Sequence, residues 1–283
     1  MRDWLARGPL RRLLDPPPRV NVVRLNGVIG RVGPVGAGMT LAGLERNLAR
    51  AFSGRNLKAV ALAVNSPGGS PVQSALIAGR IRQLAEEKGL PVLAFAEDVA
   101  ASGGYWLACA GDEIFANENS IVGSIGVIST SFGFPEVLAR FGIERRVHAA
   151  GEHKGMFDPF RPEQPSDVAR LTSIQTDMHD SFKRMVRDRR KDKLTASDET
   201  LFEGDIWTGA QALPLGLIDG LGDAHTVLRA RFGEKVHIVQ ISTRINPVRR
   251  WLGRGGREQA AYAHVAGTIG ALEDWAHWKR LGL

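Results

Sequence analysis

The sequence predicts an α/β protein whose mostly parallel sheet is covered by helices on both faces. Apolar, β-branched runs alternate with segments of helical periodicity along the chain, and several of these runs are apolar throughout. A strand buried on both faces has that continuous pattern, whereas a half-exposed strand alternates. At 283 residues, with 43% hydrophobic and 24% charged residues, the chain has the composition of one large or two modest globular domains.

The N-terminal half contains three predicted strands that alternate with helices. Residues 57–64 are apolar apart from Lys58, and residues 20–29 are mostly apolar and β-branched. Leucine and phenylalanine recur at helical spacing over 41–52. In this half we expect strands at 20–29, 57–64 and 91–95 and helices at 41–52, 72–88 and 105–109.

The C-terminal half continues the alternation with shorter strands and one long helix. Residues 164–190 form a long amphipathic stretch, and the prolines at 159–165 mark a loop inside the fold that precedes it. In this half we expect strands at 113–116, 122–129, 143–148 and 236–241 and helices at 134–141 and 164–190.

The net charge of +7 lies entirely in the two ends of the chain. Five arginines against two aspartates give residues 1–20 a net charge of +3, and seven basic against three acidic residues give 244–283 a net charge of +4. The body between them balances to zero, which argues against nucleic-acid binding. We therefore divide the chain into a basic amphipathic segment with a proline linker (1–19), a main domain (20–243) and a basic, tryptophan-containing helical segment (244–283).

The sequence gives little sign of membrane insertion. Its apolar stretches fall well short of the roughly 20 residues that cross a membrane as a helix. Arginines interrupt residues 1–14, so we do not expect a cleaved signal peptide. Four of the six tryptophans lie among arginines in the two ends, as in interfacial membrane segments, although terminal helices packed on the body would show the same pattern. We expect a cytoplasmic protein whose termini are candidates for peripheral contact with the inner membrane.

Two glycine-rich turns follow buried strands, at residues 65–69 and 100–104. Active groups of parallel sheets gather at the carboxyl ends of strands, so both turns are expected at one edge. Ser102 would lie at a helix N-terminus, where free backbone N–H groups favour an oxyanion; the alternative is an ordinary N-cap. The N–H groups of Gly103 and of Gly68 or Gly69 are candidates for an oxyanion hole, and an ordinary tight turn is the alternative.

A serine nucleophile needs a base, and none of the seven histidines lies in a recognisable triad motif. His153 is the best histidine candidate, but its neighbour Lys154 lies in a compact polar loop that follows the predicted strand at 143–148. A lysine base must be neutral near pH 7, which requires a pKa lowered by about 3 units, or about 4 kcal/mol. Burial can supply this, whereas an isolated loop lysine is usually solvated. Cys109 is the single cysteine, which excludes an internal disulfide and a zinc site built on several thiolates.

Five motifs in order give the chain a resemblance to a known family. They read NSPGG at 65–69, VAASGGYWLACAGDEIFA at 99–116, VGSIGVI at 122–128, GEHKGMFDPFRP at 151–162 and EGDIWTGAQALPLGLIDGLG at 203–222. Together they resemble the signal peptide peptidase A (protease IV) family of serine peptidases, including its shorter SohB-like members. The similarity covers residues 20–235, most of the chain.

The resemblance implies a Ser/Lys dyad with Ser102 as nucleophile and Lys154 as general base. Ser124 matches the family serine whose hydroxyl orients the lysine amine, although a turn serine would fit the same motif. The implied fold is the crotonase/ClpP-like one, a mostly parallel sheet with repeated ββα units and flanking helices. The family tends to form ring-like homo-oligomers, and the chemistry needs no metal or organic cofactor. Many relatives carry an N-terminal transmembrane anchor, for which we find no equivalent in this sequence.

These observations predict a serine endopeptidase that cleaves extended peptides through an acyl-enzyme. Signal-peptide remnants or other small or unfolded polypeptides are the expected substrates. A crotonase-type acyl-CoA enzyme shares the paired-loop oxyanion hole but usually relies on carboxylates. A non-catalytic membrane-associated scaffold could use the basic ends. Labelling of Ser102 by a fluorophosphonate separates the peptidase from the first alternative, and peptide cleavage separates it from the second.

Overall fold

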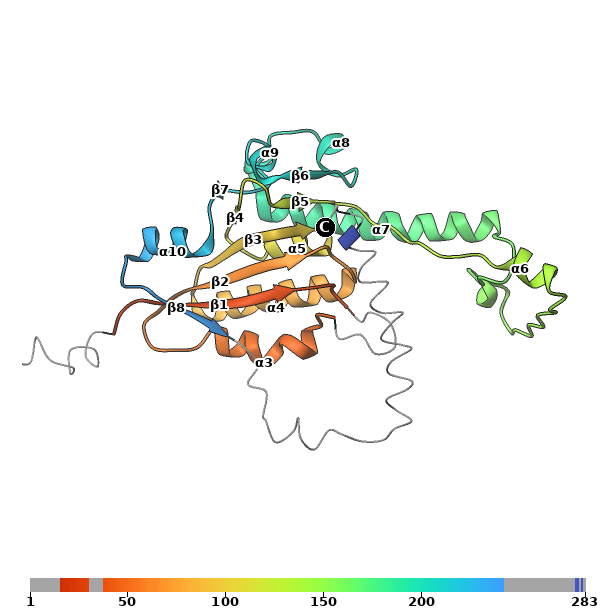
Figure 1. The fold of residues 1–283 in the computed structure, drawn as a ribbon, viewed down its shortest axis with the longest axis horizontal. Coiled ribbons are helices and arrows are strands. Elements are labelled where there is room, and N and C mark those ends of the chain that lie inside the picture. The colour runs from red at the N-terminus through yellow and green to blue at the C-terminus, as the bar shows by residue number, and fades with distance from the viewer. Residues whose placement is uncertain (1–15, 31–37, 242–277, 280, 282–283) are drawn as a thin grey trace, which may run out of the picture.

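A mostly parallel β-sheet forms the centre of the structure, a computed structural model that describes residues 16–30, 38–241, 278, 279 and 281. Its strands are β1 (Arg19–Asn26), β2 (Leu57–Ser66), β3 (Val92–Ala101), β4 (Glu113–Ala116), β5 (Ile121–Gly123), β6 (Ile206–Thr208), β7 (Gly220–Leu221) and β8 (His237–Ile241). They run in the order β6-β5-β3-β2-β1-β8, and β4 pairs with β3 and β7 (Figure 1). The pairs are parallel except that of β5 with β6, which confirms the predicted sheet.

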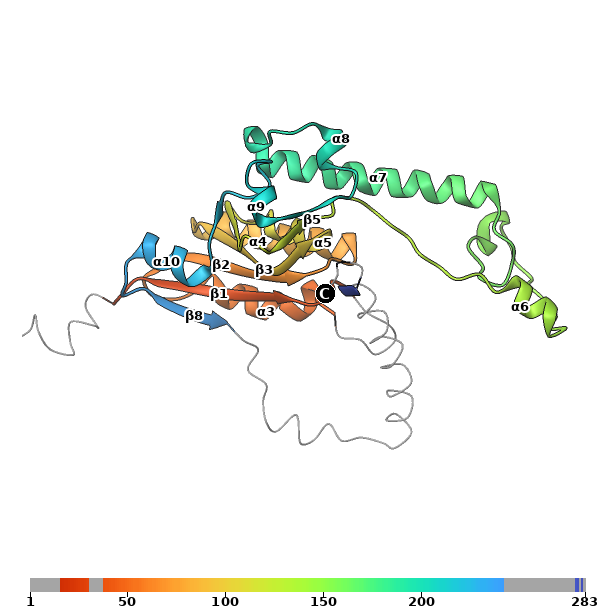
Figure 2. The ribbon, with the colours of Figure 1, turned by 45° about the horizontal axis from the view of Figure 1, so that its top comes forward.

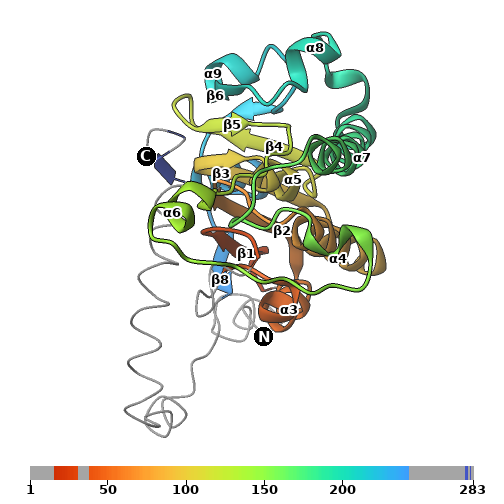
Figure 3. The same ribbon diagram turned by 90° about the vertical axis from the view of Figure 1, so that its right-hand side faces the viewer.

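Helices cover both faces of this sheet. They are α3 (Leu41–Ala51), α4 (Pro71–Lys88), α5 (Gly103–Ala108), α6 (Pro135–Arg140), α7 (Pro165–Arg190), α8 (Asp198–Leu201), α9 (Gly209–Ala212) and α10 (Ala224–Phe232), with short 3-10 helices η1 (Glu152–Gly155) and η2 (Lys191–Lys193). Helices α3, α4, α5 and α7 lie on one face (Figure 3). Helix α10 packs on the other face, where Leu228 meets Ala61 and Leu93. Fully buried strands explain the continuous apolar runs.

Most predicted elements are found with small shifts at their ends. Strand β3 is longer than expected and continues to Ala101. Two predictions were wrong: the strand expected at 122–129 is the short β5, Ile121–Gly123, and residues 143–148 form no strand. Both segments have β-forming side chains, but after Gly123 the chain leaves the sheet, and a strand needs a neighbouring strand to pair with.

Residues 127–178, here called the arm, extend away from the sheet (Figures 1 and 2). The arm contains α6, η1 and the N-terminal part of α7. Its ion pair between Arg145 and Asp158 (2.9 Å) and the contact between the Phe134 and Phe160 rings hold α6 beside the segment that follows η1. Many of its large apolar side chains are exposed, among them Ile128, Phe132, Phe141, Ile143 and Phe157.

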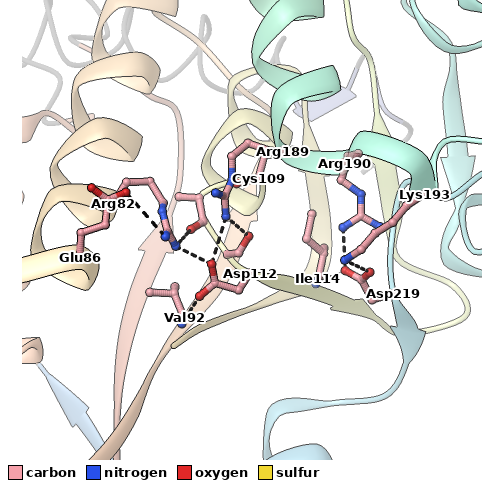
Figure 4. Close-up of polar contacts among 12 residues, drawn as sticks. Arg82, Glu86, Val92, Cys109, Asp112, Ile114, Arg189, Arg190, Lys193 and Asp219 are labelled. Carbon is pink, nitrogen blue, oxygen red and sulfur yellow. Dashed lines mark hydrogen bonds and ion pairs between the residues drawn. The ribbon is translucent and has the colours of Figure 1, made fainter. Parts of the chain in front are cut away.

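Arginines fix the C-terminal end of α7 to the body (Figure 4). Arg189 Nε donates to the carbonyl oxygen of Cys109, just after α5 (2.8 Å), and Arg190, only 2% exposed, donates to the carboxylate of Asp219 (2.6 Å). Burial acts to raise the pKa of Asp219, but hydrogen bonds from Arg190 and Lys193 outweigh it and hold this pKa below its usual value. The network joins α7 rigidly to the helix that follows β3.

The two basic ends lie mostly outside the described residues. Of the expected segment at 244–283, the structure describes Trp278, Lys279 and Leu281, and none of the residues 1–15 is described. Trp278 and Leu281 pack against Val99, Ala101 and Ile121 at the carboxyl end of the sheet. Among the described helices, none combines the length and the apolar character needed to cross a membrane.

Candidate active site

Ser102 lies in the sharp turn between β3 and α5. Its backbone has φ 52° and ψ −122°, an uncommon conformation for a residue with a side chain and one that surrounding contacts must hold. The Ser102 N–H donates to the carbonyl oxygen of Gly123 (2.7 Å). The Ser102 hydroxyl makes no capping hydrogen bond to α5, so its half-buried side chain does not act as the N-cap that we considered as an alternative.

The turn at residues 66–69 packs directly against Ser102, as expected for two turns at one edge of the sheet. A Cβ atom added to Gly68 would lie 2.7 Å from the Cβ of Ser102, and one added to Gly69 would lie 2.1 Å from the carbonyl oxygen of Ile29. Both glycines also have positive φ angles. A side chain at Gly68 would therefore push the two turns apart, and one at Gly69 would push its turn away from Ile29.

The N–H groups of the three predicted glycines have different surroundings. Gly68 donates to the Ser66 hydroxyl (3.2 Å). Gly69 forms a parallel bridge with Ile29 in which the neighbours of Gly69 make the hydrogen bonds, so its own N–H points away from Ile29. Gly103 is the first residue of α5, whose N–H has no partner within the helix. Among the described residues, neither Gly69 nor Gly103 has an acceptor for its N–H.

Ser124 lies beside the nucleophile turn. Ala101 pairs with Gly123 between β3 and β5, so the residues that follow, Ser102 and Ser124, leave the sheet next to each other. Ser124 has φ 52°, and its N–H donates to the carbonyl oxygen of Asp205 (2.6 Å). The ring of Trp207 covers Gly123, where an added Cβ would lie 2.5 Å from the ring.

Lys154 lies on the arm, away from Ser102. We expected a loop directly after a strand, but residues 143–148 are not a strand and Lys154 is an exposed residue of η1. A hollow lined by Glu152, His153 and Asp167 places η1 beside the first turn of α7. Twelve residues after Asp167, His179 of α7 lies within hydrogen-bond distance of Ile125, and 12 residues of helix rise span about 18 Å. That distance exceeds the reach of a lysine side chain, so one chain does not bring Lys154 to Ser102.

His179 is a residue at the site that the sequence analysis missed. Its Nε2 lies 3.2 Å from the carbonyl oxygen of Ile125, directly after Ser124. The signal was present in the sequence: His179, Phe182 and Val186 follow one another at helical spacing, and the last two are core residues. A histidine on the buried face of a helix is expected to meet a partner in the body.

The polar residues of α5 have structural roles. The Tyr105 hydroxyl donates to the carbonyl oxygen of Leu217 (2.7 Å), and the Trp106 ring stacks on Phe182 of α7. Burial raises the pKa of the Cys109 thiol to about 12, which keeps it protonated and unreactive. In the described part of the chain, no group of three or more His, Cys, Asp or Glu side chains is arranged to hold a metal ion.

Comparison with known proteins gives one family match. The model of "Peptidase family S49" matches residues 84–236. Among relatives, "Protease 4" of Haemophilus influenzae is 33% identical over 78% of this chain and 35% of its own length. "Putative signal peptide peptidase SppA" of Enterococcus faecium is 31% identical over 63% of this chain and 52% of its own length.

A longer relative carries a different kind of name. The Brucella abortus protein named "Na(+)/H(+) antiporter NhaA" is 46% identical over 99% of this chain, which corresponds to 40% of its own length. The chain thus spans less than half of this relative, whose name describes the whole of that longer protein.

Proposed function

The chain belongs to peptidase family S49 and has the crotonase/ClpP-like fold of that family, and from this premise we propose that it is an endopeptidase with Ser102 as nucleophile and Lys154 as general base. The family match and the relatives support a serine peptidase. The observation that carries the assignment of Ser102 is its strained turn, where the hydroxyl makes no capping bond and lies beside two N–H groups without an acceptor in the described part of the chain.

Gly69 and Gly103 are the proposed oxyanion donors. Their N–H groups have no acceptor among the described residues, and a Cβ on Gly103 would lie 3.4 Å from the nitrogen of Gly69, which supports their convergence on one atom. Donors fixed before the reaction stabilise the developing oxyanion without reorganisation. Gly68, whose N–H is bonded to Ser66, serves to let the two turns approach closely.

The base would come from a second copy of the chain. Lys154 lies beside the first turn of α7, about 18 Å of helix rise before His179, and the arm that carries it exposes apolar side chains such as Phe132 (81%) and Phe141 (72%). Next to the site, Val72 and Leu76 of α4 are also exposed (61% and 46%). Docking of one arm on the neighbouring copy would cover both apolar surfaces and desolvate the lysine, which favours its neutral form. A ring-like homo-oligomer would repeat this contact.

Each step of the reaction then has an assigned group. The neutral amine of Lys154 takes the proton of the Ser102 hydroxyl as Oγ attacks the scissile carbonyl carbon. Gly69 and Gly103 hold the oxyanion, and the lysine returns the proton to the leaving amine as the peptide bond breaks. Water, deprotonated by the same lysine, releases the acyl group as a carboxylic acid. Ser124, beside Ser102, would orient the lysine amine.

The proposed substrates are extended peptides, such as signal-peptide remnants or unfolded polypeptides. Residues 126–130 follow Ser124, and within the described chain their backbone groups have no hydrogen-bond partner. An unpaired extended segment beside the nucleophile can bind a peptide by strand addition.

The proposed domain organisation is a peptidase domain over residues 20–243 between two basic ends. We propose that these ends place the enzyme on the cytoplasmic side of the inner membrane, because they combine tryptophan with arginine. Flotation with anionic liposomes tests this: the full chain should float and a variant lacking residues 1–18 and 246–283 should not. Failure of the full chain to float would overturn the membrane proposal.

Cleavage of casein or a fluorogenic peptide tests the peptidase itself. Wild type should be active, and Ser102→Ala and Lys154→Ala should each abolish turnover. Equal activity of Lys154→Ala and wild type would exclude the dyad, and an inactive wild type that leaves Ser102 unlabelled by a fluorophosphonate would exclude the peptidase.

A further inference from the structure

Three consecutive residues at the site are tied to three different elements. Gly123 accepts a hydrogen bond from the N–H of Ser102 (2.7 Å). The N–H of Ser124 donates to the loop before β6. Ile125 accepts from His179 of α7 through its carbonyl oxygen (3.2 Å). The segment 123–125 therefore links the nucleophile turn to the rest of the molecule.

The backbone of this segment is held in an unfavourable conformation. Ser124 has φ 52°, which most residues with side chains avoid, and Gly123 before it has φ 103°, which glycine adopts readily. Such a conformation persists only where the surroundings hold it. The fully buried Ile125 anchors the end of the segment, and His179 fixes the direction of its carbonyl.

The hydrogen-bond acceptor determines which nitrogen of the His179 ring carries a proton. A carbonyl oxygen can only accept, so Nε2 must carry the proton and donate. Phe182, one helical turn further along α7, stacks on Trp106 of α5 with ring centroids 4.8 Å apart. His179 is half-buried and directly follows the arm, which ends at residue 178.

We propose that His179 is a positioning residue for the peptidase site, a role that rests on the proposed function. By holding the Ile125 carbonyl towards α7, it sets the course of residues 126–130, along which a peptide would pair. Through the same segment it holds Gly123 as the acceptor for Ser102 and keeps Ser124 beside the nucleophile. Removal of the donor should loosen this segment while the core stays packed.

Two substitutions separate the hydrogen bond from the bulk of the ring. His179→Phe keeps a planar ring but has no donor, and His179→Gln keeps an N–H donor of similar reach. The matched control is His225→Phe, because His225 is an exposed histidine on α10, away from Ser102. Turnover of a fluorogenic peptide, amide hydrogen exchange and the thermal midpoint are measured for all three and for wild type.

The hydrogen bond predicts a specific pattern. In His179→Phe, exchange of the Ser102 and Ser124 amides should be about tenfold faster and kcat should fall by about tenfold, as expected for the loss of one hydrogen bond. The thermal midpoint should change little, His179→Gln should recover most of both losses, and His225→Phe should match wild type. Unchanged amide exchange in His179→Phe, or equal losses in the Phe and Gln variants, would overturn the proposal.

The two readouts also separate this proposal from the proposed function. Amide exchange reports on the order of residues 123–125 whether or not the protein cleaves peptides. Should wild type fail to cleave peptides, the function would be wrong, and the exchange pattern would still decide whether His179 holds residues 123–125.

Discussion

A mixture of two inactive variants tests whether the dyad forms between subunits. Ser102→Ala removes the nucleophile and Lys154→Ala removes the base, and neither residue is part of the core. Because about 18 Å of helix rise separates the first turn of α7 from His179, the proposal pairs each Ser102 with the Lys154 of a neighbouring chain. In a mixed assembly, a subunit with an intact Ser102 can then meet a neighbour with an intact Lys154.

The size of the recovery follows from the geometry. In an equimolar random assembly, half of the serines and half of the lysines are intact, so about a quarter of the sites hold both when each site takes one residue from each of two neighbours. A dyad formed within one chain would give no recovery, because every chain lacks one of the two residues.

Co-expression with two different affinity tags gives the assemblies for this assay. Complexes that carry both tags are purified and their peptide cleavage is compared with wild type at equal protein concentration. The control replaces Lys154→Ala by the double variant, which leaves no intact Ser102 in the assembly and should give no activity. Absence of recovery in assemblies that contain both single variants would refute the intersubunit dyad.

Three further predictions concern the packing around the site. Gly103→Ala should abolish cleavage and lower the free energy of unfolding by about 1–3 kcal/mol in a denaturant titration, because the added Cβ would lie 2.5 Å from the Ser74 hydroxyl. The control is Gly79→Ala, which has open space around the added Cβ and should leave cleavage unchanged and stability unchanged or slightly raised. Because the pKa of Asp219 is lower in the folded than in the unfolded protein, where it is about 4, its carboxylate stabilises the fold fully above that pH. This contribution is lost as pH falls through the folded pKa, so Asp219→Asn should weaken the pH dependence of the thermal midpoint below about pH 4. Cys109, whose pKa is about 12, should resist iodoacetamide at pH 8 in the native protein and react once urea unfolds it, and rapid native labelling would contradict its burial.

The sheet and the nucleophile turn could be predicted because their sequence signals are local. A strand buried on both faces, such as β2, is apolar over its buried length, and a serine followed by two glycines after such a strand marks a tight turn. The glycines at 68 and 69 were identified for the same reason. Which of their N–H groups stays free depends on the Ser66 hydroxyl and on the bridge to Ile29, and neither is a local property.

The arm could not be predicted in the same way. Residues 143–148 have β-forming side chains, but strand formation depends on a pairing edge that the sequence does not identify. As a result, the prediction of a strand before Lys154 was wrong. The separation of Lys154 from Ser102 depends on the length and direction of α7, which the sequence does not give. His179 was missed because its hydrogen-bond partner, the carbonyl oxygen of Ile125, lies 54 positions earlier in the chain.

Labelling with a fluorophosphonate is the most direct test of the central claim, that Ser102 is an activated nucleophile. Intact-mass and peptide mapping should find one phosphonyl group per chain, attached to Ser102, and no adduct in Ser102→Ala. Lys154→Ala should label much more slowly, because the hydroxyl then lacks its base. A wild-type protein that cleaves peptides while Ser102 stays unmodified, or that is labelled at a different serine, would contradict the account.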